Sequence, residues 1–145
     1  MKNKKIKKGI IVDLDGTLAI FKGVRDGLDF SDLTKDKVNK PIKEILIMYK
    51  KYKPNNKIII ISGRPNNKKT YNQSFHWLKK NKIPFDYLYL VDRKNIPDDE
   101  NKKYFYENNI KKKYKIDFVL EDRNSVVEMW RKLGLICLQV DKTDY

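Results

Sequence analysis

Short apolar runs alternate with helix-like stretches along the whole chain. Five runs are rich in isoleucine, valine and leucine and show no regular polar alternation, so we predict strands that are buried on both faces. These runs are Gly9–Leu14, Lys57–Ile61, Asp86–Val91, Asp117–Leu120 and Leu135–Val140. Apolar positions at helical spacing predict helices at Lys40–Lys53, Asn66–Lys82, Asp98–Tyr114 and Ser125–Leu133. Strands and helices that alternate in this way are typical of an α/β fold with a mainly parallel sheet.

The last predicted helix has the clearest boundaries. Ser125 and Glu128 have the spacing of a capping box at a helix start, and Gly134 is the kind of residue that ends a helix. The buried face of this helix is predicted to consist of Val126, Trp130 and Leu133.

The single histidine, His76, lies in the predicted helix Asn66–Lys82. Helical spacing predicts that Tyr71, Phe75 and Leu78 form the buried stripe of this helix. His76 then points to the surface, and we do not expect it to be catalytic.

The length of 145 residues suits one domain, which we predict over residues 1–145. Residues 19–39 lack a clear period, and we predict a small flap or hairpin there. No apolar run approaches the roughly 20 residues that cross a membrane, and Asp13 follows the basic N-terminus too soon for a secretory signal. Cys137 is the one cysteine and lies in an apolar run, which predicts a buried, inert thiol. We therefore expect an intracellular, cytoplasmic protein without membrane partners.

Basic residues outnumber acidic ones, and the formal net charge is +14 with a sequence pI near 9.7. A positive field of this size attracts polyanions such as nucleic acid. The lysine excess is equally compatible with the codon bias of an AT-rich genome, so charge alone leaves both explanations open.

Polar side chains follow three of the predicted strands. Asp13 and Asp15 come after the first strand, Ser62-Gly63-Arg64 after the second and Glu121-Asp122-Arg123 after the fourth. Because ligands bind at the carboxyl ends of parallel strands, these residues predict one convergent polar site.

The DxDGT pattern from Asp13 to Thr17 resembles the first motif of the haloacid dehalogenase (HAD) superfamily of phosphotransferases. This resemblance implies a Rossmann-like three-layer fold with a central, mainly parallel five-stranded sheet and a minimal cap or none. It also implies that Asp13 attacks phosphorus to form an aspartyl phosphate. The carboxylate of Asp15 is then free to protonate the leaving oxygen and later to activate water. The expected cofactor is Mg²⁺, held by Asp13, Asp122 and the backbone carbonyl of Asp15.

Ser62 resembles the second superfamily motif, a hydroxyl donor to the phosphoryl group. The third motif is a lysine, and helical spacing selects Lys102, because it shares a face with Tyr106 and Ile110 whereas Lys103 lies on a solvent face. Asp98, one turn earlier, is placed to pair with Lys102.

The segment from Glu121 to Gly134 resembles the DDRxxVVEMWRxxG segment of the 3′-phosphatase domain of bacteriophage polynucleotide kinase-phosphatase. The DxDGTLA start, the SGR sequence, a DxxxK from Asp98 to Lys102 and the QV at Gln139-Val140 extend this likeness, which is compatible with a phage or viral source. The resemblance implies a substrate site that contains Thr17, Arg25, Gly63, Arg64, Asp98 and Arg123. Glu121 stands where the family has an aspartate, and its longer carboxylate could reach the metal through water.

These features predict a Mg²⁺-dependent polynucleotide 3′-phosphatase that leaves a 3′-hydroxyl on DNA or RNA. The expected partners are nucleic acid 3′-phosphate ends and a separate kinase or ligase, because no GxxxxGK[ST] kinase motif occurs in the sequence. The alternatives are a HAD phosphatase for free nucleotides or other small phosphomonoesters, and a nucleic-acid-binding module that has lost turnover.

Overall fold

The computed structural model describes residues 5–144 and contains a five-stranded sheet in the order β5-β4-β1-β6-β7. Every pair of neighbouring strands is parallel. The strands are β1 (Lys7–Val12), β4 (Lys57–Ser62), β5 (Tyr87–Leu90), β6 (Tyr114–Arg123) and β7 (Cys137–Thr143). The predicted α/β class, the five strands and their parallel direction are confirmed.

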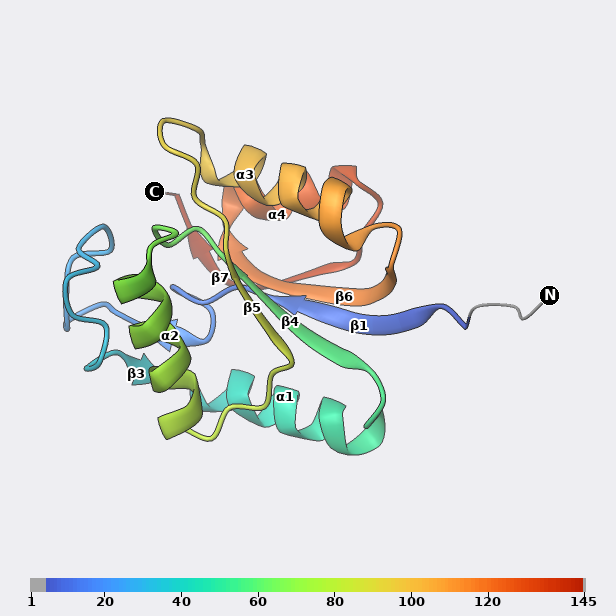
Figure 1. The fold of residues 1–145 in the computed structure, drawn as a ribbon, viewed down its shortest axis with the longest axis horizontal. Helices are drawn as coiled ribbons and strands as arrows, with labels where there is room; N and C mark the ends of the chain where they lie inside the picture. The colour runs from blue at the N-terminus through green and yellow to red at the C-terminus, as the bar shows by residue number, and fades with distance from the viewer. Residues whose placement is uncertain (1–4, 145) are drawn as a thin grey trace.

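Helices cover both faces of this sheet (Figure 1). The helices α1 (Lys40–Tyr52) and α2 (Lys68–Lys80) lie on one side, and α3 (Asp98–Phe105), its π-helical continuation η1 (Tyr106–Ile110) and α4 (Asn124–Lys132) lie on the other. Successive strand residues point to opposite faces, so Ile58 and Ile60 enter the core beneath α1 and α2, while Ile59 and Ile61 enter the core beneath α3 and α4. The result is the three-layer arrangement that the resemblance implied.

The segment after β1 forms the predicted small hairpin. Its two short strands, β2 (Ala19–Ile20) and β3 (Lys37–Val38), are antiparallel. The segment is anchored to α2, because Trp77 Nε1 donates a hydrogen bond of 2.9 Å to the carbonyl of Asp36 and Leu33 N donates one of 2.9 Å to Gln73 Oε1. This insertion stays small, so the carboxyl ends of the strands remain accessible.

Two predicted helix boundaries are wrong. The helix predicted to reach Tyr114 ends at Ile110, because Tyr114 already begins β6. The predicted capping box at Ser125 is not formed. β6 continues to Arg123, which becomes the N-cap without a side-chain hydrogen bond, and Ser125 falls inside α4. Gly134 adopts a φ of 85° and ends α4 as predicted.

The buried face of α2 also differs from the prediction. Tyr71 and Phe75 are each 38% exposed, whereas the buried residues of the helix are Thr70, Ser74, Trp77 and Leu78. The inner face carries a serine because Arg64 donates a hydrogen bond of 2.8 Å to Ser74 Oγ. Helical periodicity cannot anticipate this buried polar contact, which turns the two aromatic rings outward.

Other local predictions agree with the structure. His76 is exposed and Cys137 is buried. None of the helices within residues 5–144 is long and apolar enough to cross a bilayer.

Candidate active site

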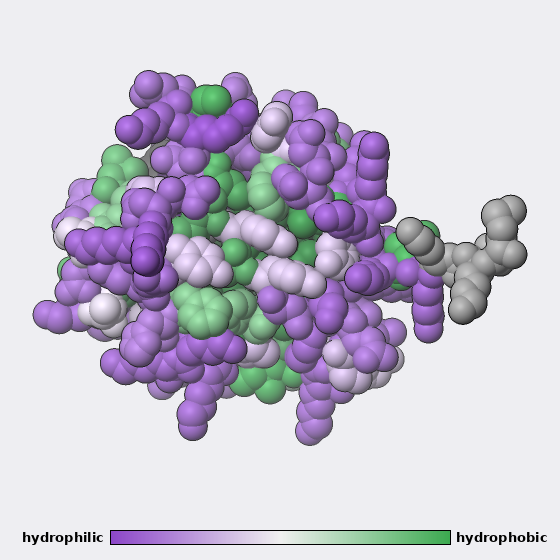
Figure 2. Space-filling view, in the orientation of Figure 1, coloured by the Kyte–Doolittle hydropathy of each residue, from purple (hydrophilic) through white to green (hydrophobic). Residues whose placement is uncertain are grey.

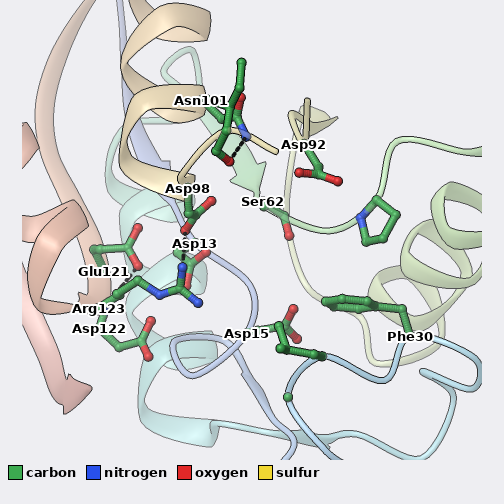
Figure 3. A pocket seen from close by; sticks show the side chains of 15 residues that line it. Asp13, Asp15, Phe30, Ser62, Asp92, Asp98, Asn101, Glu121, Asp122 and Arg123 are labelled. Carbon is green, nitrogen blue, oxygen red and sulfur yellow. Dashed lines mark hydrogen bonds and ion pairs between the residues drawn. The ribbon is translucent and has the colours of Figure 1, made fainter. Parts of the chain in front are cut away.

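A pocket of about 260 Å³ lies at the carboxyl ends of β1, β4 and β6 (Figure 3). The predicted site residues that line it are Asp13, Asp15, Ser62, Gly63, Asp98, Glu121, Asp122 and Arg123. The predicted convergence of three strand ends is therefore confirmed. Sequence analysis missed seven further residues of the lining, which are Gly27, Leu28, Phe30, Pro65, Asp92, Ile96 and Asn101.

The turn after β1 brings its acidic residues into the pocket. Thr17 N and Leu18 N both donate hydrogen bonds to the carbonyl of Leu14, at 3.1 and 2.9 Å, which closes a tight turn. Gly16 permits this turn for two reasons: its φ is 82°, and an added Cβ would collide with the carboxylate of Asp122.

Lys102 lies at the centre of the buried acidic cluster. Its Nζ donates hydrogen bonds to Asp13 Oδ1 at 2.8 Å and to Glu121 Oε2 at 3.0 Å, and it lies 3.5 Å from Asp98 Oδ2. The Lys102 side chain is 1% exposed, whereas Lys103 is exposed and pairs with Glu107. The predicted inward face of this helix and the predicted pairing with Asp98 are confirmed.

The charges in this cluster do not balance. Burial raises the pKa of Asp13 to about 7 against the opposing effect of Lys102, and burial together with Asp13 raises the pKa of Glu121 to about 7. Burial by itself would lower the pKa of Lys102, but Asp13, Asp98 and Glu121 outweigh it and hold that pKa well above its ordinary value. One ammonium therefore faces several buried carboxylates, and negative charge remains in excess.

A divalent cation fits this excess of negative charge. Asp13, Glu121 and Asp122 each offer a carboxylate oxygen, and these atoms lie within 4.8 Å of one another. Oxygen donors of this kind suit Mg²⁺. All three residues are therefore candidates to hold the ion. The Glu121 oxygens already have partners, since Oε2 accepts from Lys102 and Oε1 accepts from the backbone N of Asp122 at 3.1 Å.

Two threonines orient the aspartates of the cluster. Thr17 Oγ1 lies 3.1 Å from Asp13 Oδ2 and 3.3 Å from Asp122 Oδ1, and Thr143 Oγ1 donates to Asp122 Oδ2 at 2.8 Å. Thr17 is fully buried and contacts carboxylates rather than the pocket surface. Sequence analysis missed Thr143, although its place at the end of β7, next to the strand that carries Asp122, is a signal that could have found it.

Both oxygens of the Asp15 carboxylate accept hydrogen bonds from arginine. Arg25 Nη2 and Arg64 Nη2 donate to Asp15 Oδ1 at 2.7 and 2.8 Å, and Arg64 Nε donates to Oδ2 at 3.0 Å. Burial by itself would raise the pKa of Asp15, but Arg64 and Arg25 hold it below its usual value. Asp15 pairs with both arginines because two buried guanidinium groups need buried counter-charges.

Asp36 is the second counter-charge, and sequence analysis missed it. It accepts from Arg25 Nε at 2.9 Å and from Arg64 Nη2 at 3.2 Å. The side chains of Arg25 and Arg64 are 5% and 1% exposed, so they lie beneath the pocket surface and do not face an incoming strand. No motif distinguishes Asp36 from the neighbouring acidic residues Asp29 and Asp32 in the sequence.

The loop after β4 brings Ser62 and Gly63 against α3. Ser62 Oγ accepts from the backbone N of Arg64 at 3.2 Å and lies beside the pocket (Figure 3). An added Cβ on Gly63 would collide with Oδ1 of Asp98, a buried oxygen without a hydrogen-bond partner among the described residues. Arg123 Nη1 lies 3.5 Å from the other carboxylate oxygen of Asp98.

Comparisons with known proteins agree with this geometry. Residues 7–145 match the family described as Polynucleotide kinase PNKP phosphatase domain. A solved structure of a Pnkp1/Rnl/Hen1 complex contains a chain with 36% identity and a TM-score of 0.88, and the match covers 99% of this chain and 49% of that one. A structure of the Pnkp1/Rnl/Hen1 RNA repair complex gives 35% identity and a TM-score of 0.87, covering 100% of this chain and 46% of the other. The chain thus spans about half the length of these relatives.

Proposed function

Because the chain belongs to the PNKP phosphatase-domain family of the HAD superfamily, we propose that it is a Mg²⁺-dependent polynucleotide 3′-phosphatase that leaves a 3′-hydroxyl end. The observation that carries this proposal is the placement of Asp13 at the pocket, bonded to Lys102 and next to Asp122. A nucleophilic carboxylate, a buried ammonium and a cation site then act on one phosphoryl group.

In the first step, a carboxylate oxygen of Asp13 attacks phosphorus while the bond to the 3′ oxygen breaks. The carboxyl group of Asp15, which takes up a proton from solvent when it gives up a guanidinium contact to the bound substrate, donates that proton to the leaving oxygen, which departs as the 3′-hydroxyl. Asp13 and Asp122 would hold Mg²⁺, which would neutralise negative charge at the site. Lys102 keeps the Asp13 carboxylate oriented and adds positive charge beside the transferring group, and Ser62 donates a hydrogen bond to it.

In the second step, Asp15 takes a proton from water, and the water oxygen attacks the phosphorus of the aspartyl phosphate. Inorganic phosphate leaves, and the Asp13 carboxylate is restored. Asp15 performs both proton transfers only after it exchanges a guanidinium contact for the reacting oxygen, because both of its oxygens are bonded to arginine before substrate binds. Arg25 and Arg64 are therefore proposed to position Asp15 beside the substrate.

A polynucleotide end is the proposed substrate because the site is open and the protein is basic. The insertion after β1 borders the pocket through Gly27, Leu28 and Phe30, but it carries only a two-stranded hairpin and not a separate cap. The net charge of +14 attracts a polyanion. One relative belongs to an RNA repair complex, so we propose RNA as well as DNA ends as substrates, and a separate kinase or ligase as the protein that acts on the same ends.

The test compares three substrates: an oligonucleotide with a 3′-phosphate, the same oligonucleotide with a 5′-phosphate, and a 3′-phosphorylated mononucleotide. We expect phosphate release from the first to be much faster than from the mononucleotide, no release from the 5′-phosphate, and no release from any of them in excess chelator. Equal rates on the mononucleotide would favour the small-phosphomonoester alternative. No release from any of the three would indicate a binding module without turnover.

A further inference from the structure

Six aromatic side chains form a continuous surface over the edge of the sheet. They come from α2, from β5 and its preceding loop, and from α3, and we call them the β5 aromatic face: Tyr71, Phe75, Phe85, Tyr87, Tyr89 and Phe105. Figure 2 shows pale and green side chains gathered in the middle of this side of the molecule, with purple hydrophilic side chains around them. All six residues are at least partly exposed.

The rings contact one another across these elements. Tyr71 stacks with Phe75 at a centroid distance of 6.1 Å, and Phe75 meets Phe85 edge-on at 5.6 Å. Tyr87 stacks with Tyr89 at 6.0 Å.

Tyr89 also lies 4.7 Å from the ring of Phe105 on α3. Ring contacts therefore link α2 to the loop before β5, and β5 to α3.

The surroundings of the face are cationic. Lys79 Nζ lies over the rings of Phe75 and Phe85 at 5.5 and 5.2 Å. The helix α2 carries four lysines and no acidic residue. The strand β5, which lies at the edge of the sheet, has the sequence YLYL and carries no charge at all. Aromatic rings within a rim of lysines have the composition of surfaces that stack bases and attract phosphates.

This face is continuous with the candidate active site. Pro65 lines the pocket and lies just before α2, which carries Tyr71 near its start. Asp92 lines the pocket and lies three positions after Tyr89. Ser62, also in the pocket lining, pairs with Leu90 of β5. The carboxyl end of β5 and the start of α2 therefore connect the pocket lining to the elements that carry the aromatic face.

We propose that the β5 aromatic face binds single-stranded nucleic acid and stacks the bases that precede a 3′ end held in the pocket. The direction of the bound strand, with its 3′ end in the pocket, rests on the proposed function. A second copy of this chain fits less well, because two surfaces rimmed with lysine repel each other. The rings then contribute to strand binding independently of the reaction at the terminal phosphate.

The test uses a fluorescein-labelled single strand with a 3′-hydroxyl end, so that binding is measured by anisotropy without hydrolysis. The variant replaces both exposed rings of α2, as Tyr71→Leu with Phe75→Leu, which keeps helix propensity and apolar bulk. The matched control is Tyr52→Leu. Tyr52 is 81% exposed at the end of α1 and has Lys53 5.1 Å above its ring, but it lies outside the face.

We expect the double variant to bind the strand about 5-fold more weakly or worse, since a stacked base contributes at least this factor. Tyr52→Leu should bind as the unaltered protein does. The turnover of a 3′-phosphorylated mononucleotide should be the same in all three proteins. Unchanged strand affinity in the double variant would overturn the inference.

Two outcomes separate this inference from the proposed function. Strand binding that depends on the rings, without phosphate release from any substrate, supports the face and contradicts the phosphatase. Phosphate release with unchanged strand affinity in the double variant supports the phosphatase and contradicts the proposed role of the face. A dimer seen by sedimentation that the double variant abolishes, with strand affinity unaltered, would assign the face to a second copy and overturn the inference.

Discussion

The guanidinium of Arg64 holds the carboxylate of Asp15 by two hydrogen bonds, from Nε to Oδ2 at 3.0 Å and from Nη2 to Oδ1 at 2.8 Å. A planar fork of this kind fixes the direction of a carboxylate as well as its charge. The Arg64 side chain is almost fully buried, so its hydrogen bonds to Asp15 are shielded from solvent. Arg64 is therefore placed to control how Asp15 enters the pocket.

The first prediction concerns this contact. Arg64→Lys should lower turnover by about 100-fold, because a point charge cannot keep both hydrogen bonds and a misplaced catalytic group costs a factor of this order. The loss should be equal for an oligonucleotide 3′-phosphate and for a small chromogenic phosphate, as measured by initial rates.

Arg131→Lys is the matched control, because Arg131 bonds to the carbonyl of Cys137, away from the pocket. A loss confined to the oligonucleotide would contradict the positioning role and show that Arg64 grips the strand.

The second prediction compares two neighbouring lysines. Lys102→Ala should lower turnover by roughly 100- to 1000-fold, because it removes a charged donor beside the phosphoryl group. It should also destabilise the fold by about 3–5 kcal/mol, since buried carboxylates lose their partner. Lys103→Ala removes only an exposed pair with Glu107 at 3.8 Å and should change stability by at most about 0.5 kcal/mol. Denaturant titration and initial rates measure both effects, and equal behaviour of the two variants would refute the helix face assigned here.

The third prediction tests the close approach of Gly63 to α3. Gly63→Ala should destabilise the protein by about 1–3 kcal/mol, because the new methyl group overlaps the carboxylate of Asp98. In a chain that already carries Asp98→Ala, the same Gly63→Ala change should cost much less, because the space for that methyl group is open. Thermal unfolding measures both costs. An equal cost in both chains would mean that the strain lies elsewhere in the loop.

The fourth prediction concerns the thiol of Cys137. Burial raises its pKa to about 12, so the folded protein should resist alkylation by iodoacetamide at mildly alkaline pH. The same protein in denaturant should react quickly, because an exposed thiol ionises near its ordinary pKa of about 8.5. Mass spectrometry of the modified fraction provides the measurement. Fast alkylation of the folded chain would show that β7 opens readily.

Much of the fold was predictable because its signals are local. Short apolar runs located all five strands, and the glycine at Gly134 marked the end of α4 correctly. Helical spacing also separated Lys102 from Lys103. In each case the physical cause lies within one element or at its end.

The remaining features depend on contacts between distant segments. Asp36 looked like any loop carboxylate, and only the folded hairpin brings it to Arg25 and Arg64. The same buried network bonds both oxygens of Asp15 to arginine, and the DxDGT motif gives no sign of these contacts. Helical spacing assigned Tyr71 to the buried stripe of α2, whereas the structure buries Ser74 and leaves Tyr71 partly exposed.

The central claim is that Asp13 carries the phosphoryl group during turnover. The most direct measurement uses an oligonucleotide with a radiolabelled 3′-phosphate, quenches the reaction in acid during turnover, and maps the labelled peptide by mass spectrometry. We predict label on Asp13 alone, and neither label nor phosphate release in the Asp13→Asn variant, which keeps the shape of the side chain but cannot attack. Label on another residue, or continued turnover in Asp13→Asn, would contradict the account.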